Sequence, residues 1–191
     1  MIDFDEATHT YRVGGQVRPS VTQILRPIVD FSAVPLDVLE AKSDLGSRVH
    51  RATELDDADD LEESSVGDDV RPYLRAWRDY LRDTGAVVLL SEGRVYNPGA
   101  NYCGTLDRVL DIDGVEWLVD IKTSAQVHRA VGPQTAAYEQ ALGWRSPLRR
   151  GVVQLRPDGS YRFRELNNPR DWVIFQACNL IFRTNQENPY V

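Results

Sequence analysis

The sequence predicts an α/β fold in which a mixed β-sheet is flanked by helices. Three strand-like segments with alternating apolar residues follow one another at 86–96, 102–112 and 115–123. A helical segment at 133–143 separates them from a strand pair at 151–165, whose turn contains Pro-Asp-Gly. Helical patterns also precede and follow this region. Strands that alternate with helices are typical of a sheet with helices packed on it.

Helices are expected on both sides of the strand region. Ser20 is placed to cap a short helix that Pro27 ends. Apolar residues at helical spacing predict longer helices over 35–55 and 70–82, and the acidic stretch between them is expected to be a loop. A last helix begins near Asn168. The first twenty residues resemble a small hairpin around a Gly-Gly turn.

Length and composition are those of an ordinary soluble domain. The 191 residues predict a single domain, with an N-terminal hairpin and helical region at 1–83 and a core carrying the candidate site at 86–191. The chain is 42% hydrophobic and 27% charged, without an apolar run that could cross a membrane. The polar N-terminus is unlike a secretory signal, so we expect a cytoplasmic protein. Two cysteines are too few for a disulfide framework or a four-cysteine metal site.

The negative charge is concentrated in one segment. The chain carries a net charge of -7, but residues 54–69 hold nine acids and no Lys or Arg. The rest of the chain has 20 acids against 22 bases. Such a block is usually a solvated face, and the alternative is a mimic of nucleic acid or a gate over a basic groove. The overall acidity therefore does not exclude DNA binding.

One triplet carries recognisable chemistry. Asp120 and Lys122 are two residues apart on an expected strand, so their side chains share one face, and Asp107 on the preceding strand can face the same space. Two carboxylates that hold a divalent cation, with an ammonium beside them, suit metal-assisted hydrolysis of a phosphodiester. The other interpretation is a salt bridge at a strand edge. Only Lys42 and Lys122 are lysines, so arginine is the usual cation of this chain.

Four segments in this order resemble motifs of the PD-(D/E)xK nuclease superfamily, in particular its RecB-like branch and phage-type exonucleases. They match a glycine-then-histidine helix, a Gly-x-x-Asp element, an Asp-x-Lys-Thr element and a Gln-x-x-x-Tyr helix. In this chain they are Leu45–His50, Gly104–Asp107, Asp120–Thr123 and Gln134–Tyr138. The similarity extends from about Phe4 to Leu142. Each motif is short, and the signal comes from the set in this order.

The resemblance implies a restriction-endonuclease-like core with a Mg²⁺ or Mn²⁺ site. Asp107 and Asp120 would ligate the metal with the carbonyl of Ile121, and Lys122 would orient or activate the attacking water. His50 matches an additional metal ligand of the family, and neutral imidazole can join a mainly carboxylate site. Without the other motifs, His50 would be interpreted as a packed helix histidine.

Further residues are candidates for the same site. Glu92, on the strand before the hairpin, is expected to be a second-metal ligand or to support the first ligands, and the alternative is a surface charge. Gln134 and Tyr138 share one helical face and could contact a DNA phosphate or brace Lys122. The alternative is a tyrosine packed on the sheet beside a satisfied amide.

Basic residues near this centre are candidates for DNA contacts. Arg94, Arg108 and Arg129 flank the motifs and could bind phosphates, unless they are solvated or ion-paired. His128 lies in an expected loop near the site and could touch DNA. His9 is assigned to the N-terminal hairpin.

Together these expectations describe a metal-dependent DNA exonuclease of phage recombination or DNA processing, acting in a bacterial cytoplasm. DNA is the expected substrate, and a phage recombinase or single-strand annealing protein is a candidate partner. Two alternatives stay open: a structure-selective endonuclease, and a non-catalytic DNA-binding protein on a nuclease fold. A more distant option is a DNA mimic built on the acidic segment.

Overall fold

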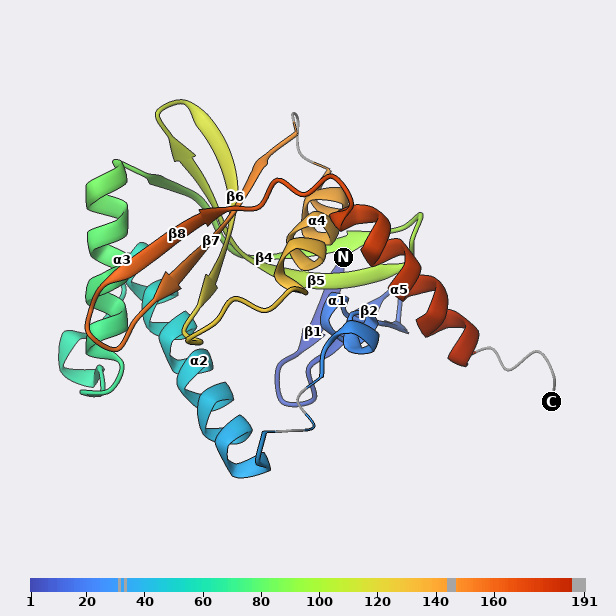
Figure 1. The fold of residues 1–191 in the computed structure, drawn as a ribbon, viewed down its shortest axis with the longest axis horizontal. Helices are drawn as coiled ribbons and strands as arrows, with labels where there is room; N and C mark the ends of the chain where they lie inside the picture. Colours follow the sequence, from blue (N-terminus) through green and yellow to red (C-terminus); the bar gives the residue numbers. More distant parts are fainter. Residues whose placement is uncertain (31, 33, 144–146, 187–191) are drawn as a thin grey trace.

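The computed structural model describes residues 1–30, 32, 34–143 and 147–186 (Figure 1). Its eight strands are β1 (Ile2–Asp5), β2 (Thr10–Val13), β3 (Gln16–Arg18), β4 (Val87–Asn97), β5 (Tyr102–Ile112), β6 (Val115–Lys122), β7 (Arg149–Leu155) and β8 (Tyr161–Glu165). Its helices are α1 (Val21–Ile24), η1 (Arg26–Ile28), α2 (Leu36–Asp57), η2 (Glu63–Ser65), α3 (Arg71–Thr84), α4 (Val131–Leu142) and α5 (Asp171–Gln186). None of these helices is both long and apolar enough to cross a membrane.

A five-stranded mixed sheet forms the centre of the fold, which confirms the predicted α/β class. Its order is β4-β5-β6-β7-β8, and every neighbouring pair is antiparallel except β6 and β7. The parallel pair is joined through α4, because parallel neighbours need a crossover connection. The N-terminal strands form a separate antiparallel sheet in the order β1-β2-β3, one strand more than the predicted hairpin.

Helices cover both faces of the five-stranded sheet (Figure 1). Alternation along β5 and β6 sends Leu110 and Val119 into one hydrophobic cluster, which Trp77 of α3 completes. Val109 and Leu118 point to the other face, where they join a second cluster with side chains of α1, α4 and α5. The sheet is therefore buried on both sides, and a polar group that lies within it needs a partner inside the protein.

Local signals in the sequence set the helix ends near the site. Ser20 caps α1 as predicted: its Oγ accepts a hydrogen bond from the Gln23 amide at 3.1 Å, and its own amide donates to Gln23 Oε1 at 3.0 Å. Pro27 does not end the helical path, which continues as η1. Gly85 ends α3 in the left-handed conformation at φ 64°, where glycine carries no Cβ penalty.

The apolar stripe that the sequence predicts for helix α2 is buried only in part. Only Val49, Ala52 and Thr53 are buried, all in its C-terminal half. Leu36 is 73% exposed, because the N-terminal half runs out beyond the sheet and has no layer to pack against (Figure 1).

The acidic stretch is mostly exposed, as its composition predicts, but it is not wholly a loop. Its first acids belong to α2, and several carboxylates form ion pairs with arginines of α2 and α3. Examples are Arg48 with Asp69 at 2.7 Å and Arg78 with both Asp56 and Glu63. Much of this negative charge is neutralised within the protein, which argues against a DNA mimic.

Candidate functional site

The candidate site lies where β5 and β6 stop pairing with each other. Their shared ladder runs from Ile112↔Val115 to Arg108↔Val119. Beyond that point β5 pairs with β4, and β6 pairs with β7 as far as Lys122. The Ile121 amide donates a 2.7 Å hydrogen bond to Asp107 Oδ2 across the divergence. The Asp107 carboxylate thus takes the place of a backbone acceptor of the ladder. This bond fixes Asp107 at the opening between the two diverging strands.

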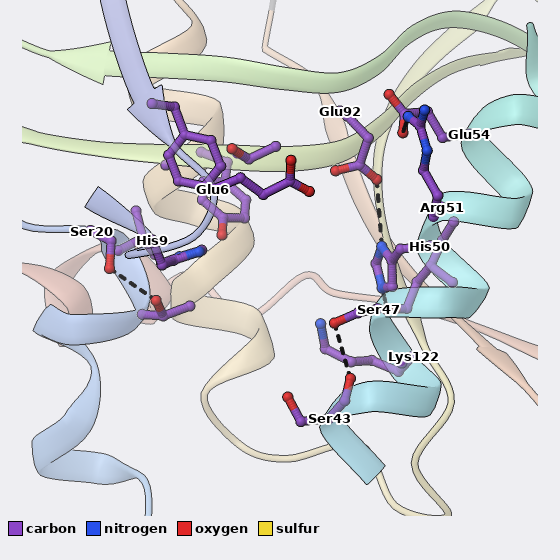
Figure 2. A pocket seen from close by; sticks show the side chains of 18 of the residues that line it. Glu6, His9, Ser20, Ser43, Ser47, His50, Arg51, Glu54, Glu92 and Lys122 are labelled. Atoms are coloured by element: carbon purple, nitrogen blue, oxygen red, sulfur yellow. Dashed lines mark hydrogen bonds and ion pairs between the residues drawn. The ribbon is translucent and has the colours of Figure 1, made fainter. Parts of the chain in front are cut away.

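Three side chains from three elements meet at this opening. His50 of α2, Glu92 of β4 and Asp107 of β5 each offer a ligand atom, and these atoms lie within 4.8 Å of one another. His50 Nδ1 is 3.5 Å from Glu92 Oε1 and 3.9 Å from Asp107 Oδ1. Figure 2 shows the imidazole facing Glu92. The three residues could hold a metal ion. Glu92 also pairs with the buried Arg108 at 2.9 Å, so it is not a free surface charge.

The orientation of His50 is set by the β6 backbone. Its Nε2 lies 3.2 Å from the carbonyl oxygen of Ile121, which can only accept a hydrogen bond. Nε2 therefore carries a hydrogen, and Nδ1 is turned toward the carboxylates as a possible ligand atom. The Ile121 carbonyl was expected to reach the metal directly. In the structure this carbonyl accepts a hydrogen bond from His50, which orients the imidazole.

Asp120 and Lys122 complete the site from β6. Asp120 is 1% exposed, and Lys122 Nζ lies 2.7 Å from its Oδ2 as an ion pair. Neither carboxylate oxygen has another polar partner among the described residues. A buried carboxylate with a single partner is costly. These oxygens therefore fit a cation.

The charges of the site are strongly coupled. Burial raises the pKa of Asp120 to about 6, in spite of the opposing effect of Lys122. Burial alone would lower the pKa of Lys122, but Asp120, Asp107 and Glu92 raise it above its usual value, so the ammonium stays charged. For His50, burial also acts downward, and the Asp107 and Glu92 carboxylates turn the net shift of its pKa upward. The carboxylates of the site thus favour the protonated, positively charged forms of Lys122 and His50.

Arg108 is a correction to the predicted DNA contacts. Its side chain is fully buried, where it donates from Nε to Asp57 Oδ2 at 2.5 Å, from Nη2 to Thr53 Oγ1 at 3.0 Å and from Nη1 to Glu92 Oε1 at 2.9 Å. Trp77 Nε1 donates to the other oxygen of Asp57 at 2.8 Å. A guanidinium engaged in this way is not available to a phosphate. It holds Glu92 in place.

Glu92 also has an unusual backbone conformation, because its φ of 47° lies in the left-handed region. A residue with a Cβ adopts this conformation at a cost, and such strain is often found at functional sites. Glu92 is followed by the buried Gly93 in the middle of β4. The departure from regular strand geometry lies beside the metal-ligand group.

The opening is the floor of a cleft of about 540 Å³. One wall is α2, with Ser47, His50 and Arg51, and the other is the N-terminal sheet together with Glu6 and His9 of its β1–β2 turn (Figure 2). Glu54 also lines the cleft and pairs with Arg51 at 2.7 Å. The cleft thus lies between two segments that enclose Lys122 from opposite sides.

The N-terminal wall contains residues that the sequence did not point to. Phe4, His9 and Tyr11 form an aromatic cluster, with ring centroids 4.5–5.7 Å apart. Arg94 lies over the Phe4 ring at 5.2 Å and is exposed beside this wall. The hairpin alone gave no signal that these rings face the candidate site, because the contact depends on how the two sheets pack.

Gln134 and Tyr138 share a helix face as predicted. The Gln134 side-chain amide donates to the Tyr138 hydroxyl at 3.1 Å. Tyr138 is 4% exposed and burial raises its pKa well above the usual value, so it stays a neutral phenol. Its ring packs on Gly104: a Cβ there would lie 2.5 Å from Tyr138 Cε1. The tyrosine packs on β5 and lines the cleft that contains His50 and Glu92, while Gln134 lines a second cavity.

Two candidates for DNA contacts lie outside the central group. Arg129 is exposed and donates from Nε to the Ile28 carbonyl at 3.1 Å. His128 lines the second cavity, and its Nδ1 accepts a hydrogen bond from the Ala130 amide at 3.2 Å.

Comparison with known proteins adds no family. No protein-family model matches the sequence, and no curated protein matches it. What stands on the structure itself is a mixed α/β fold with a buried His/Glu/Asp group that could hold a metal ion.

Proposed function

We propose that this protein is a metal-dependent DNA exonuclease with a restriction-endonuclease-like core of the PD-(D/E)xK type. The observation that carries the proposal is the convergence at one strand divergence. His50, Glu92 and Asp107 could together hold a metal ion there, and the buried Asp120 has only the Lys122 ammonium as a partner among the described residues. If Asp120 and Lys122 formed only a structural salt bridge, His50, Glu92 and Asp107 would not need to lie at the same point.

The donor set favours Mg²⁺ or Mn²⁺. Carboxylate oxygens are the ligands that these hard cations prefer, and Mn²⁺ also accepts an imidazole nitrogen. Cys103 and Cys178 are buried in the sheet region and in α5, and neither belongs to the ligand group, so the site has no thiolate that would favour a softer metal. Asp107, Asp120 and Glu92 would hold the ion with His50.

Each residue has a part in phosphodiester hydrolysis. A divalent cation bound here would polarise a phosphate oxygen and lower the pKa of bound water. Lys122 stays protonated beside Asp120, so it would stabilise negative charge on the phosphate or orient the water, and it would not act as a base. The Ile121 carbonyl holds the His50 imidazole, and Arg108 holds Glu92.

The two lysines of the chain provide a matched test. Lys122→Met and Lys42→Met each remove one ammonium, but Lys42 is exposed on α2. Labelled linear duplex and single-stranded DNA are incubated with Mg²⁺ or Mn²⁺, alongside covalently closed circles. We expect wild type and Lys42→Met to degrade linear DNA and to leave closed circles intact. Lys122→Met should be inactive while still folded, with a lower melting temperature because the buried Asp120 loses its partner.

Two results would contradict the proposal. If Lys122→Met cleaves DNA as wild type does, the assigned centre is wrong. If wild type binds DNA in EDTA but does not cleave it with either metal, a non-catalytic DNA-binding role is favoured. Cleavage of closed circles would instead identify an endonuclease.

A further inference from the structure

A second cavity adjoins the cleft that contains the candidate metal ligands. It has a volume of about 580 Å³, against about 540 Å³ for the first. The two cavities share His9, Thr22 and Lys122 in their linings. Lys122 therefore stands at the junction, and a chain bound across its ammonium would have one part in each cavity.

The two cavities differ in charge. Glu6, Glu54 and Glu92 line the first, beside the buried carboxylates of the candidate site. No Asp or Glu is among the described residues that line the second, although the chain contains 29 acids. Its lining includes Arg26 and Lys122. The first cavity is suited to a cation and the second to an anion.

The walls of the second cavity suit the rest of a nucleotide. Leu25, Val29, Ala130 and Val131 give it an apolar surface against which a base or sugar could pack. Polar side chains join them in the lining, including the amides of Gln23 and Gln134 and the hydroxyl of Thr22. A mostly apolar cavity with a few polar groups is typical of small-molecule sites, whose volumes are about 300–1,000 Å³.

From this arrangement we propose that the second cavity binds a deoxynucleoside monophosphate. Resting on the proposed nuclease function, the ligand is the terminal nucleotide of the strand that is being degraded. Its phosphate lies near Lys122 and Arg26, and its nucleoside lies against Val29 and Val131. A site for one nucleotide beside the metal ligands explains why such an enzyme would act at strand ends.

The test measures binding of monophosphates without catalysis. Deoxyadenosine and thymidine 5′- and 3′-monophosphates are titrated into the protein in EDTA by calorimetry, with the unphosphorylated nucleosides as comparison. Arg26→Glu reverses a charge in the lining, and Val29→Trp fills the apolar side. Both residues lie outside the proposed metal site. Arg12→Glu on β2 is the matched control, because Arg12 is exposed and lines neither cavity.

We expect wild type and Arg12→Glu to bind a monophosphate alike and more tightly than its nucleoside. Arg26→Glu should weaken binding about tenfold or more, the loss expected when a charge-assisted hydrogen bond is removed. Val29→Trp should weaken monophosphates and nucleosides together. Preference for the 5′- or the 3′-monophosphate indicates which end the cavity receives.

The proposal is overturned if wild type binds no monophosphate, or if Arg26→Glu and Arg12→Glu weaken binding equally. Because Arg26 is exposed, its substitution tests the cavity even if Val29→Trp fails to fold. The nuclease function is scored separately by DNA cleavage with Mn²⁺. Monophosphate binding without cleavage would contradict the nuclease function but would support the nucleotide site. Cleavage without monophosphate binding would contradict the nucleotide site alone.

Discussion

The Ile121 amide donates to the Asp107 carboxylate at 2.7 Å across the point where β5 and β6 diverge. This bond links the strands that carry Asp107 and Asp120, and it leaves Asp107 Oδ1 directed toward His50. One oxygen of Asp107 is thus structural and the other belongs to the ligand group. The relationship ties the position of a candidate ligand to the backbone of the Asp120–Lys122 strand.

Asp107→Asn separates these two roles. The asparagine can still present an oxygen to the Ile121 amide, but it removes the negative charge that a divalent cation needs. We expect DNA cleavage to fall about 100-fold or more, since even residues that only support a metal ligand contribute about 10- to 100-fold. Urea unfolding should show little loss of stability. A variant that unfolds in much less urea would show that the carboxylate is mainly structural.

Arg108→Ala is expected to reduce both stability and metal binding. Removing the guanidinium leaves Asp57 buried and unpaired, and losing one partner of a buried pair costs about 3–5 kcal/mol. Glu92 also loses its Nη1 donor, so Mn²⁺ affinity measured by calorimetry should fall. Arg94→Ala is the control, because Arg94 is exposed and its loss should cost less than about 1 kcal/mol.

Arg108→Lys tests the positioning role with less damage. A lysine keeps the positive charge but cannot reach Asp57, Thr53 and Glu92 together, because those contacts use three different guanidinium nitrogens. We expect Mn²⁺ affinity to fall more than the free energy of unfolding does. Unchanged affinity in a folded variant would limit Arg108 to a structural role.

The parts of the site that sequence could predict depend on local rules. Alternation along β6 placed Asp120 and Lys122 side by side, and Ser20 formed its capping box within four residues. Mixed-sheet topology followed from the order of strands and α4. These features need only the backbone period and neighbouring residues.

The failed predictions concern partners that are distant in sequence. Arg108 lies 51 residues from Asp57, and nothing near it in the chain reveals that α2 brings a buried carboxylate to it. For the same reason the sequence did not reveal that arginines such as Arg78 pair with acids of residues 54–69. The aromatic wall of Phe4 and His9 depends on packing between sheets, which local patterns do not encode.

Gly104→Ala should destabilise the protein mainly through a clash with the Tyr138 ring. A Cβ at this position would lie 2.5 Å from Tyr138 Cε1, so either the ring or the strand has to move. Overpacking of this kind costs about 1–3 kcal/mol, which urea unfolding can measure. The double variant Gly104→Ala, Tyr138→Leu should lose less than the two single changes added together. Simple additivity would contradict the steric explanation.

Asp120→Asn should make the metal-free protein more stable at high pH. Burial raises the pKa of Asp120 from 3.8 to about 6, so the folded state binds this proton more tightly than the unfolded state. Protonation of Asp120 therefore stabilises the folded state fully below pH 3.8, and this stabilisation is lost as the pH rises through 6. At pH 8 the buried carboxylate is a cost that asparagine does not carry.

The measurement is the melting temperature in EDTA at pH 8 and at pH 5. At pH 8 we expect Asp120→Asn to melt above wild type by roughly 2–4 °C, which corresponds to about 1 kcal/mol for a chain of this size. The gap should narrow at pH 5, where part of the wild-type Asp120 is protonated. Mn²⁺ should reverse the order at pH 8, because only the carboxylate binds the cation well. Asp3→Asn, on exposed β1, should show neither effect. If Asp120→Asn melts below wild type in EDTA at pH 8, the ion pair with Lys122 outweighs the cost of burying the carboxylate. The carboxylate of Asp120 would then stabilise the metal-free protein, which contradicts the prediction.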